Sequence, residues 1–95
     1  MGAAACLASR VRAADNVVFR NLDGEAVLLN LDTGVYFGLD RVGTRIWELL
    51  DGASTLGDVL TGIVAEFDVD CDRAERDLVD LVQQLAGKGL VEVTV

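Results

Sequence analysis

The feature that most constrains the fold is a change in the spacing of apolar residues at Asp40. From Val17 to Leu39, β-branched, aromatic and leucine residues occur in short runs separated by turn residues, a pattern typical of strands. After Asp40 the apolar residues recur at helical spacing. A chain of 95 residues has room for one domain. The sequence therefore predicts a single α+β domain in which strands come first and helices follow.

Two glycine-containing turns divide the strand region. Asp23-Gly24 follows VVFRNL and suits a tight hairpin, because both positions tolerate positive φ angles. Asp32-Thr33-Gly34 follows EAVLLNL and places a glycine where a left-handed conformation is usually needed, and VYFGL comes next. The predicted result is a three-stranded antiparallel meander. Its middle strand is apolar on both faces and is expected to be central.

Three amphipathic helices are expected after the meander. Asp40 can cap a first helix that runs to about Leu50. Thr55 and Asp58 form a capping-box pair for a second helix, and a third follows the acidic turn at residues 68–70. The predicted fold class is α+β and winged-helix-like, with the three-stranded antiparallel β-meander followed by a three-helix bundle.

The two ends of the chain carry weaker signals. Residues 1–16 show no periodic apolar face and no secretory signal, so we expect a flexible segment ahead of a domain that spans residues 17–95. The final VEVTV is expected to form a short strand or an ordered tail. Trp47 is expected in the core beneath the sheet. Cys6 and Cys71 lack the spacing of a metal site or redox pair, and free thiols fit a cytoplasmic setting.

Composition argues against several classes of function. The chain has 16 acidic and 8 basic residues and a net charge of -8, which repels phosphate backbones and anionic lipid surfaces. It has no histidine to act as a general base and no glycine-rich phosphate loop. We therefore expect no catalytic residues, no metal and no cofactor, and neither nucleic acid nor membrane as a partner.

A series of motifs carries a resemblance to a known family. A leucine-rich strand, an Asp-Thr-Gly turn and an aromatic strand ending in Leu-Asp are followed by Arg-Ile-Trp-Glu-Leu-Leu-Asp-Gly, a Phe-Asp-Val-Asp turn and a closing Gly-Leu-Val-Glu. In this order, over about residues 17–93, the sequence resembles the PqqD family. The resemblance implies a RiPP recognition element, a peptide chaperone that binds the leader segment of a ribosomally synthesised precursor peptide. It would present that leader to a modifying enzyme, a radical SAM enzyme in PQQ biosynthesis.

The resemblance also implies a binding site. The family holds the leader as an added strand against the third strand, in a groove closed by the third helix. The last strand of a meander is an edge unless VEVTV covers it, and such an edge would also allow a homodimer. The peptide-binding positions expected in this sequence are Val35, Tyr36, Phe37, Gly38, Leu39, Arg73, Arg76, Asp77, Val79 and Asp80.

For some residues, and for the protein as a whole, the sequence allows more than one interpretation. Val79 lies off the core stripe of its helix and is either a groove residue or a lone exposed valine. Arg73 and Arg76 either bind acidic leader residues or pair with Asp77 and Asp80 along the helix. For the whole protein, the alternatives are a structural subunit of a maturation enzyme that binds no peptide and a winged-helix DNA-binding protein. The acidic third helix argues against the second alternative.

Overall fold

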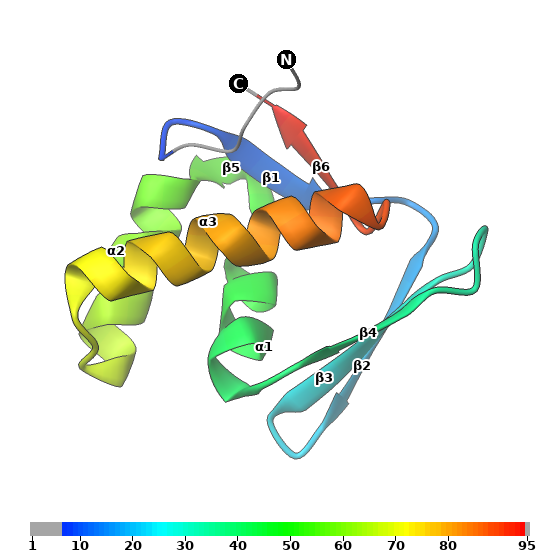
Figure 1. Ribbon diagram of the computed structural model, residues 1–95, viewed down its shortest axis with the longest axis horizontal. Helices are drawn as coiled ribbons and strands as arrows, with labels where there is room; N and C mark the ends of the chain where they lie inside the picture. The colour runs from blue at the N-terminus through cyan, green and yellow to red at the C-terminus, as the bar shows by residue number, and fades with distance from the viewer. Residues whose placement is uncertain (1–6, 95) are drawn as a thin grey trace.

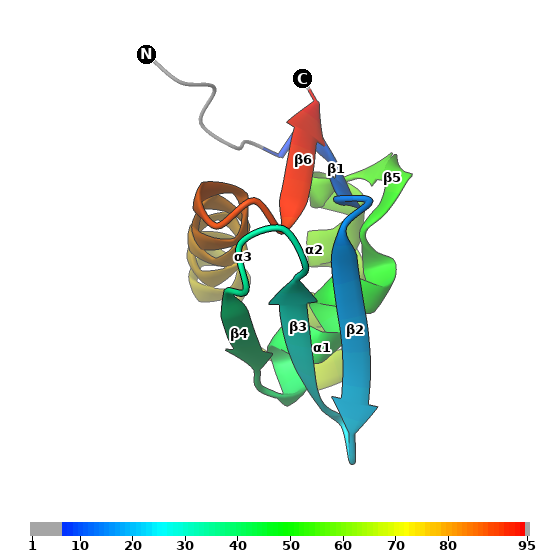
Figure 2. The ribbon, with the colours of Figure 1, turned by 90° about the vertical axis from the view of Figure 1, so that its right-hand side faces the viewer.

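A computed structural model describes residues 7–94, which fold into two small antiparallel sheets around three helices (Figure 1). One sheet has the strand order β2-β3-β4 and the other β5-β1-β6. The second sheet lies at the end of the molecule away from the hairpin that joins β2 and β3 (Figure 2). The elements are β1 (Arg10–Ala13), β2 (Val17–Leu22), β3 (Glu25–Asn30), β4 (Tyr36–Leu39), α1 (Arg41–Leu49), β5 (Asp51–Thr55), α2 (Leu56–Phe67), α3 (Cys71–Gly87) and β6 (Val91–Thr94).

The predicted meander is confirmed, with β3 between β2 and β4. Asp23 and Gly24 have φ angles of 57° and 86°, as the tight hairpin between β2 and β3 requires. At the second turn the Gly34 N–H donates to the Asn30 carbonyl at 2.8 Å, and the Asn30 N–H donates to the Val35 carbonyl at 3.0 Å. Gly34 has a φ of 74° and ends a four-residue loop, residues 31–34, between the paired residues Asn30 and Val35.

The helix starts agree with the sequence. The Asp40 carboxylate accepts the Gly43 N–H at 2.7 Å at the start of α1. Thr55 and Asp58 form the expected capping box at α2. Trp47 is 9% exposed, and its ring stacks on Phe19 of β2 with centroids 6.2 Å apart. Trp47 therefore packs beneath the sheet, as predicted.

The expected flexibility of the N-terminal segment is wrong for Arg10–Ala13. These residues form β1, the central strand of the second sheet, in register with β6 from Arg10–Thr94 to Ala13–Val91. Val11 is 1% exposed and belongs to the core. The partners of β1 lie about 40 and 80 residues away, so no local pattern signals the strand. Residues 1–6 lie outside the described part of the chain.

The C-terminal VEVTV forms the predicted strand over Val91–Thr94, and this strand pairs with β1. It therefore does not cover β4. The other strand of that sheet, β5, was not predicted, because its sequence DGAST reads as a turn. Amide N–H groups of Ser54 and Ala53 donate to the Asp51 carboxylate and hold its pKa below its ordinary value.

A buried asparagine ties the first sheet to the end of α3. Asn30 is 2% exposed, and its Nδ2 donates to the carbonyls of Lys88 and Gly89, at 3.2 Å each. Its Oδ1 accepts from Asn16 Nδ2 at 2.9 Å. Since these bonds join β3 to the chain just after α3, they fix how that helix lies relative to the meander.

Candidate functional site

The strand β4 has one open edge. Among the described residues β4 pairs only with β3, because β6 is taken up by the other sheet. Figure 2 shows β4 at the side of the meander nearest to α3, with β2 at the far side. An exposed strand edge presents unpaired N–H and C=O groups to which an extended peptide can add.

The register shows which backbone groups of β4 face this open edge. Leu28 is paired with Phe37 and Leu29 with Tyr36, and the Asn30 N–H donates to the Val35 carbonyl. In an antiparallel ladder the directly bonded pairs alternate with unbonded ones. The backbone groups of Phe37 and Leu39 are therefore directed to β3. Those of Tyr36 and Gly38 point to the open edge.

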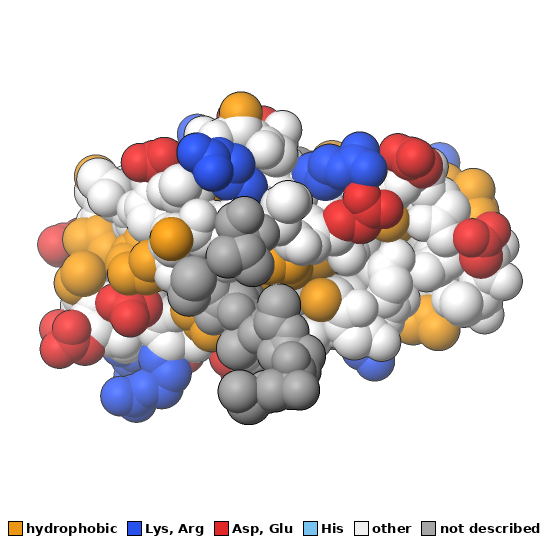
Figure 3. Space-filling view, turned by 90° about the horizontal axis from the view of Figure 1, so that it is seen from above, with side chains coloured by type: hydrophobic (Ala, Val, Ile, Leu, Met, Phe, Trp, Pro, Cys, Tyr) orange, Lys and Arg blue, Asp and Glu red, His pale blue; other side chains and the backbone are white. Residues whose placement is uncertain are grey.

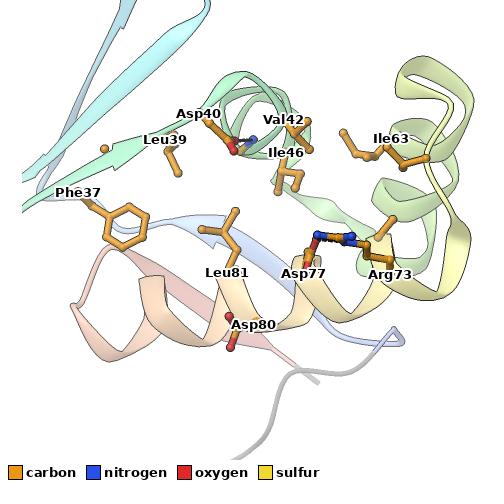
Figure 4. A pocket seen from close by; sticks show the side chains of 14 residues that line it. Phe37, Leu39, Asp40, Val42, Ile46, Ile63, Arg73, Asp77, Asp80 and Leu81 are labelled. Carbon is orange, nitrogen blue, oxygen red and sulfur yellow. Dashed lines mark hydrogen bonds and ion pairs between the residues drawn. The ribbon is translucent and has the colours of Figure 1, made fainter.

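A groove of about 510 Å³ lies beside β4, between this strand and the helices. Phe37 and Leu39 project into it from β4, and Leu81 faces them from α3 (Figure 4). The floor is apolar: Leu39, Ile46 and Ile63 are each no more than 5% exposed. A groove of this kind accepts apolar side chains of a bound peptide. The full lining is Phe37, Gly38, Leu39, Asp40, Val42, Gly43, Ile46, Ile63, Val69, Arg73, Ala74, Asp77, Asp80 and Leu81.

Charged side chains form the rim of the groove on the α3 side. The Arg73 Nε lies 3.9 Å from the Asp77 Oδ2, and both side chains are largely exposed (Figure 4). The Asp80 Oδ2 accepts a hydrogen bond from Gln84 Nε2 at 3.0 Å. Exposed pairs at this distance hold their partners weakly, so the rim charges can exchange their partners for those of a ligand.

The structure brings six of the ten expected positions into the groove. Two others belong to the same edge without lining it: Val35 precedes β4, and the Tyr36 side chain, 68% exposed, lies on the opposite face of the sheet from Phe37. The positions that line the groove are Phe37, Gly38, Leu39, Arg73, Asp77 and Asp80.

Arg76 and Val79 are not brought to the groove. They line a second, shallow hollow on α3 together with Asp72, Glu75, Gln83 and Asp80, and Asp80 borders both this hollow and the groove. Val79 is half-buried and packs against the core. Residues 76 and 79 are separated from 73, 77 and 81 by the helical rotation of about 100° per residue, which places the two sets on different sides of α3.

Eight lining residues were absent from the sequence-based site. They are Asp40, Val42, Gly43, Ile46, Ile63, Val69, Ala74 and Leu81. The apolar members other than Val69 lie on α1, α2 or α3, in helical stripes that predict core positions, and Val69 lies in the turn between α2 and α3. The stripe does not show that β4 and α3 leave part of this core uncovered, so the floor of the groove had no distinct signal.

The described residues offer little else that carries chemistry. They contain no group of three or more His, Cys, Asp or Glu side chains able to hold a metal ion. Cys71 is exposed and free of any disulfide to them. None of their helices is long and apolar enough to cross a membrane. On the face that carries β1 and β6, acidic and basic side chains are interspersed with apolar ones (Figure 3). The groove with its strand edge is therefore the candidate site.

Fold and site together define a small winged-helix-like α+β domain with an open strand edge beside an apolar groove. The family model for coenzyme PQQ synthesis protein D (PqqD) matches residues 25–91. The chain belongs to the PqqD family. The matched range includes β3, β4 and all three helices, and hence every wall of the groove.

Two solved structures are similar to this chain along most of its length. A complex of TbiB1 with the TbiA(beta) leader peptide is 47% identical, with a TM-score of 0.78, over 85% of this chain and 94% of that one. A lasso peptide synthetase B1 complexed with the leader peptide is 26% identical, with a TM-score of 0.77, over 87% of this chain and 98% of that one. The comparison with curated proteins gave no match. The predicted family and the winged-helix-like fold class are thus confirmed.

Proposed function

We propose that this protein binds the leader segment of a ribosomally synthesised precursor peptide and presents it to a modifying enzyme. The leader adds as a strand to the open edge of β4, where Tyr36 and Gly38 offer backbone groups. Alternate leader side chains then enter the groove under α3. The observation that carries the proposal is that β4 has both an open strand edge, reached by the backbone of Tyr36 and Gly38, and an apolar groove, into which Phe37 and Leu39 project.

Two further observations support a binding role. Both similar solved structures are complexes with leader peptides, and the chain covers nearly all of each. The groove offers no histidine, and its acidic residues stand on an open rim beside Arg73, without a nucleophile and base in contact. We infer that the protein recognises its peptide and that the chemistry is performed by the partner.

We also propose a class of partner enzyme and a cellular location. The PqqD resemblance favours a radical SAM enzyme, whereas the similarity to a lasso peptide synthetase B1 favours an enzyme of lasso-peptide maturation. We propose the second class, because that similarity extends over 87% of the chain. A cytoplasmic location agrees with the exposed free thiol of Cys71. A homodimer through β4 would occupy the edge that the leader needs, so the loaded protein would pair through β2 or remain single.

A short strand added to β4 makes a small interface. Four residues of strand and one groove give well under about 1,200 Å² of buried surface, which is typical of transient complexes with modest affinity. A leader that is bound weakly is also released readily to the next enzyme. We therefore expect a dissociation constant in the range of roughly 0.1–10 μM.

Calorimetric titration of the TbiA(beta) leader peptide into the isolated protein tests the proposal. Saturable 1:1 binding is expected, with no binding of a scrambled peptide of the same composition. A protein that serves only as a structural subunit of an enzyme would bind neither peptide. Absence of binding to both peptides would therefore refute the proposed function.

A further inference from the structure

The groove beside β4 has an uneven distribution of charge. Of the described residues that line it, three are carboxylates, Asp40, Asp77 and Asp80, and one is a guanidinium, Arg73. The other ten are glycine or apolar. The rim of the groove therefore has a formal charge of -2 above an apolar floor, and it favours a ligand of the opposite sign.

Nearby cations do not neutralise this rim. The Arg41 side chain extends toward the hairpin between β2 and β3. Its Nε lies 4.0 Å from the point that a Cβ atom on Gly24 would occupy. Arg45 is bound to Glu66 at 3.0 Å and to Glu48 at 3.3 Å. Arg73 approaches Asp77 only to 3.9 Å, with side chains 82% and 69% exposed. An ionised carboxylate has about four acceptor positions, so Asp77 and Asp80 keep acceptor capacity for a ligand.

One of the two α3 carboxylates stands beside an apolar side chain. Asp77 and Leu81 are four residues apart and share one face of the helix. Asp80, one turn after Asp77, borders the groove from the outer side of α3, where its carboxylate points away from Leu81 (Figure 4). Lysine and arginine have apolar stems and a charged head. Such a side chain can lie along Leu81 and bring its cation to Asp77 and Asp80. An acidic side chain in the same place would face two like charges.

We propose that this groove selects leader segments that carry a lysine or arginine two residues from an apolar side chain. The apolar side chain enters the floor, and the cation binds Asp77 and Asp80. The spacing of two follows because alternate residues of the added strand face the same side. This inference rests on the proposed function and adds the chemical class of the peptide that the site prefers.

A charge scan of the peptide tests the inference. The TbiA(beta) leader peptide is prepared with each position replaced in turn by lysine and by glutamate, and the dissociation constants are measured by calorimetry. At a position that faces the rim, the lysine peptide is expected to bind about tenfold more tightly than the glutamate peptide. At the adjacent positions, which face away from the groove, the ratio is expected to be near one.

Two protein variants locate the source of the preference. In Asp77→Asn with Asp80→Asn, the tenfold ratio is expected to fall to about one, because Asp40 and Arg73, with opposite charges, are then the charged residues that remain in the lining. Asp72→Asn with Glu75→Gln is the matched control: it removes the same charge from the shallow hollow on the other side of α3 and is expected to leave the ratio unchanged.

The outcomes separate the inference from the proposed function. If peptides bind but the lysine-to-glutamate ratio is near one at every position, or persists in the Asp77→Asn, Asp80→Asn variant, the charge preference is refuted and leader binding stands. An equal loss of the ratio in the control variant also refutes it, because the effect then comes from net charge. If no peptide of the series binds, the proposed function and this inference both fail.

Discussion

Asn30 joins the meander by hydrogen bonds to the end of the helix opposite the strand edge. Its amide group donates to two carbonyls after α3 and accepts from Asn16, all from a side chain that is 2% exposed. A buried polar group that loses its partners carries the cost of desolvation. The width of the groove between β4 and α3 thus depends on a residue that does not line it.

We predict that Asn30→Ala lowers the free energy of unfolding by about 2 kcal/mol, because it strands the carbonyls of Lys88 and Gly89 without this donor. The measurement is urea denaturation. Asn21→Ala is the control, since Asn21 makes one exposed hydrogen bond, to the Gly24 N–H, and its loss should cost well under half as much. Equal losses for both variants would contradict the role assigned to Asn30.

At the scale of single elements, β4 has backbone groups that serve two different neighbours. Tyr36→Pro removes an N–H that points to the open edge, whereas Phe37→Pro removes one that is directed to β3. We predict that Tyr36→Pro weakens leader binding at least tenfold with a small change in melting temperature. Phe37→Pro should destabilise the fold by on the order of 3 kcal/mol.

Paired thermal denaturation and calorimetric titration of the two proline variants check this prediction. If Tyr36→Pro destabilised the protein as much as Phe37→Pro, the register deduced for β4 would be wrong. If Tyr36→Pro were stable and bound the leader with unchanged affinity, the strand-addition mechanism would be wrong.

The strand β1 makes the N-terminal segment part of the folded domain. Val11 is 1% exposed, so Val11→Ala is expected to lower the free energy of unfolding by about 2 kcal/mol, from lost transfer energy and the cavity left behind.

Deletion of residues 1–14 removes β1, the central strand of its sheet, and is expected to lower the melting temperature by well over 10 °C. Differential scanning calorimetry measures both. A deletion variant as stable as the full chain would mean that β1 contributes nothing.

The elements that the sequence predicts are those whose signals are local. Capping residues such as Asp40 and Thr55 lie within three residues of the amides they bind, and Gly34 marks its own turn. β1 has only one buried side chain in RVRA, and β5 follows an Asp-Gly pair that reads as a turn. Their pairing depends on partners far along the chain. A pattern in a short window therefore could not reveal them.

The same difference between local signals and distant contacts decides which residues of the candidate site could be predicted. The β4 and α3 residues were both predicted through the family resemblance, and the edge position of the last meander strand supports the β4 residues independently. Arg76 and Val79 were included because the sequence gives the rotation around a helix but not which side meets β4. Ile63 and Leu81 were assigned to the core and lie in the floor of the groove. Whether each of these residues lines the groove depends on how α3 lies over the sheet, which the sequence does not give.

For the molecule as a whole, the charge of -8 argues against DNA binding by this winged-helix-like domain. Neutralising phosphates requires basic side chains, and α3 instead carries four acidic residues in its 17 positions against two basic ones. We predict no binding to a duplex of random sequence at about 0.15 M salt in a fluorescence anisotropy assay. Micromolar affinity with a steep dependence on salt would contradict this prediction.

Amide hydrogen exchange at β4 reports whether the leader becomes an added strand on it. With the TbiA(beta) leader peptide at saturation, exchange at Tyr36 and Gly38 should slow markedly, because their N–H groups gain hydrogen bonds to the peptide. Exchange at Phe37 and Leu39 should change little, since these amides are already directed to β3. Saturation of the protein by the peptide with unchanged exchange at Tyr36 and Gly38 would exclude addition of the leader to β4.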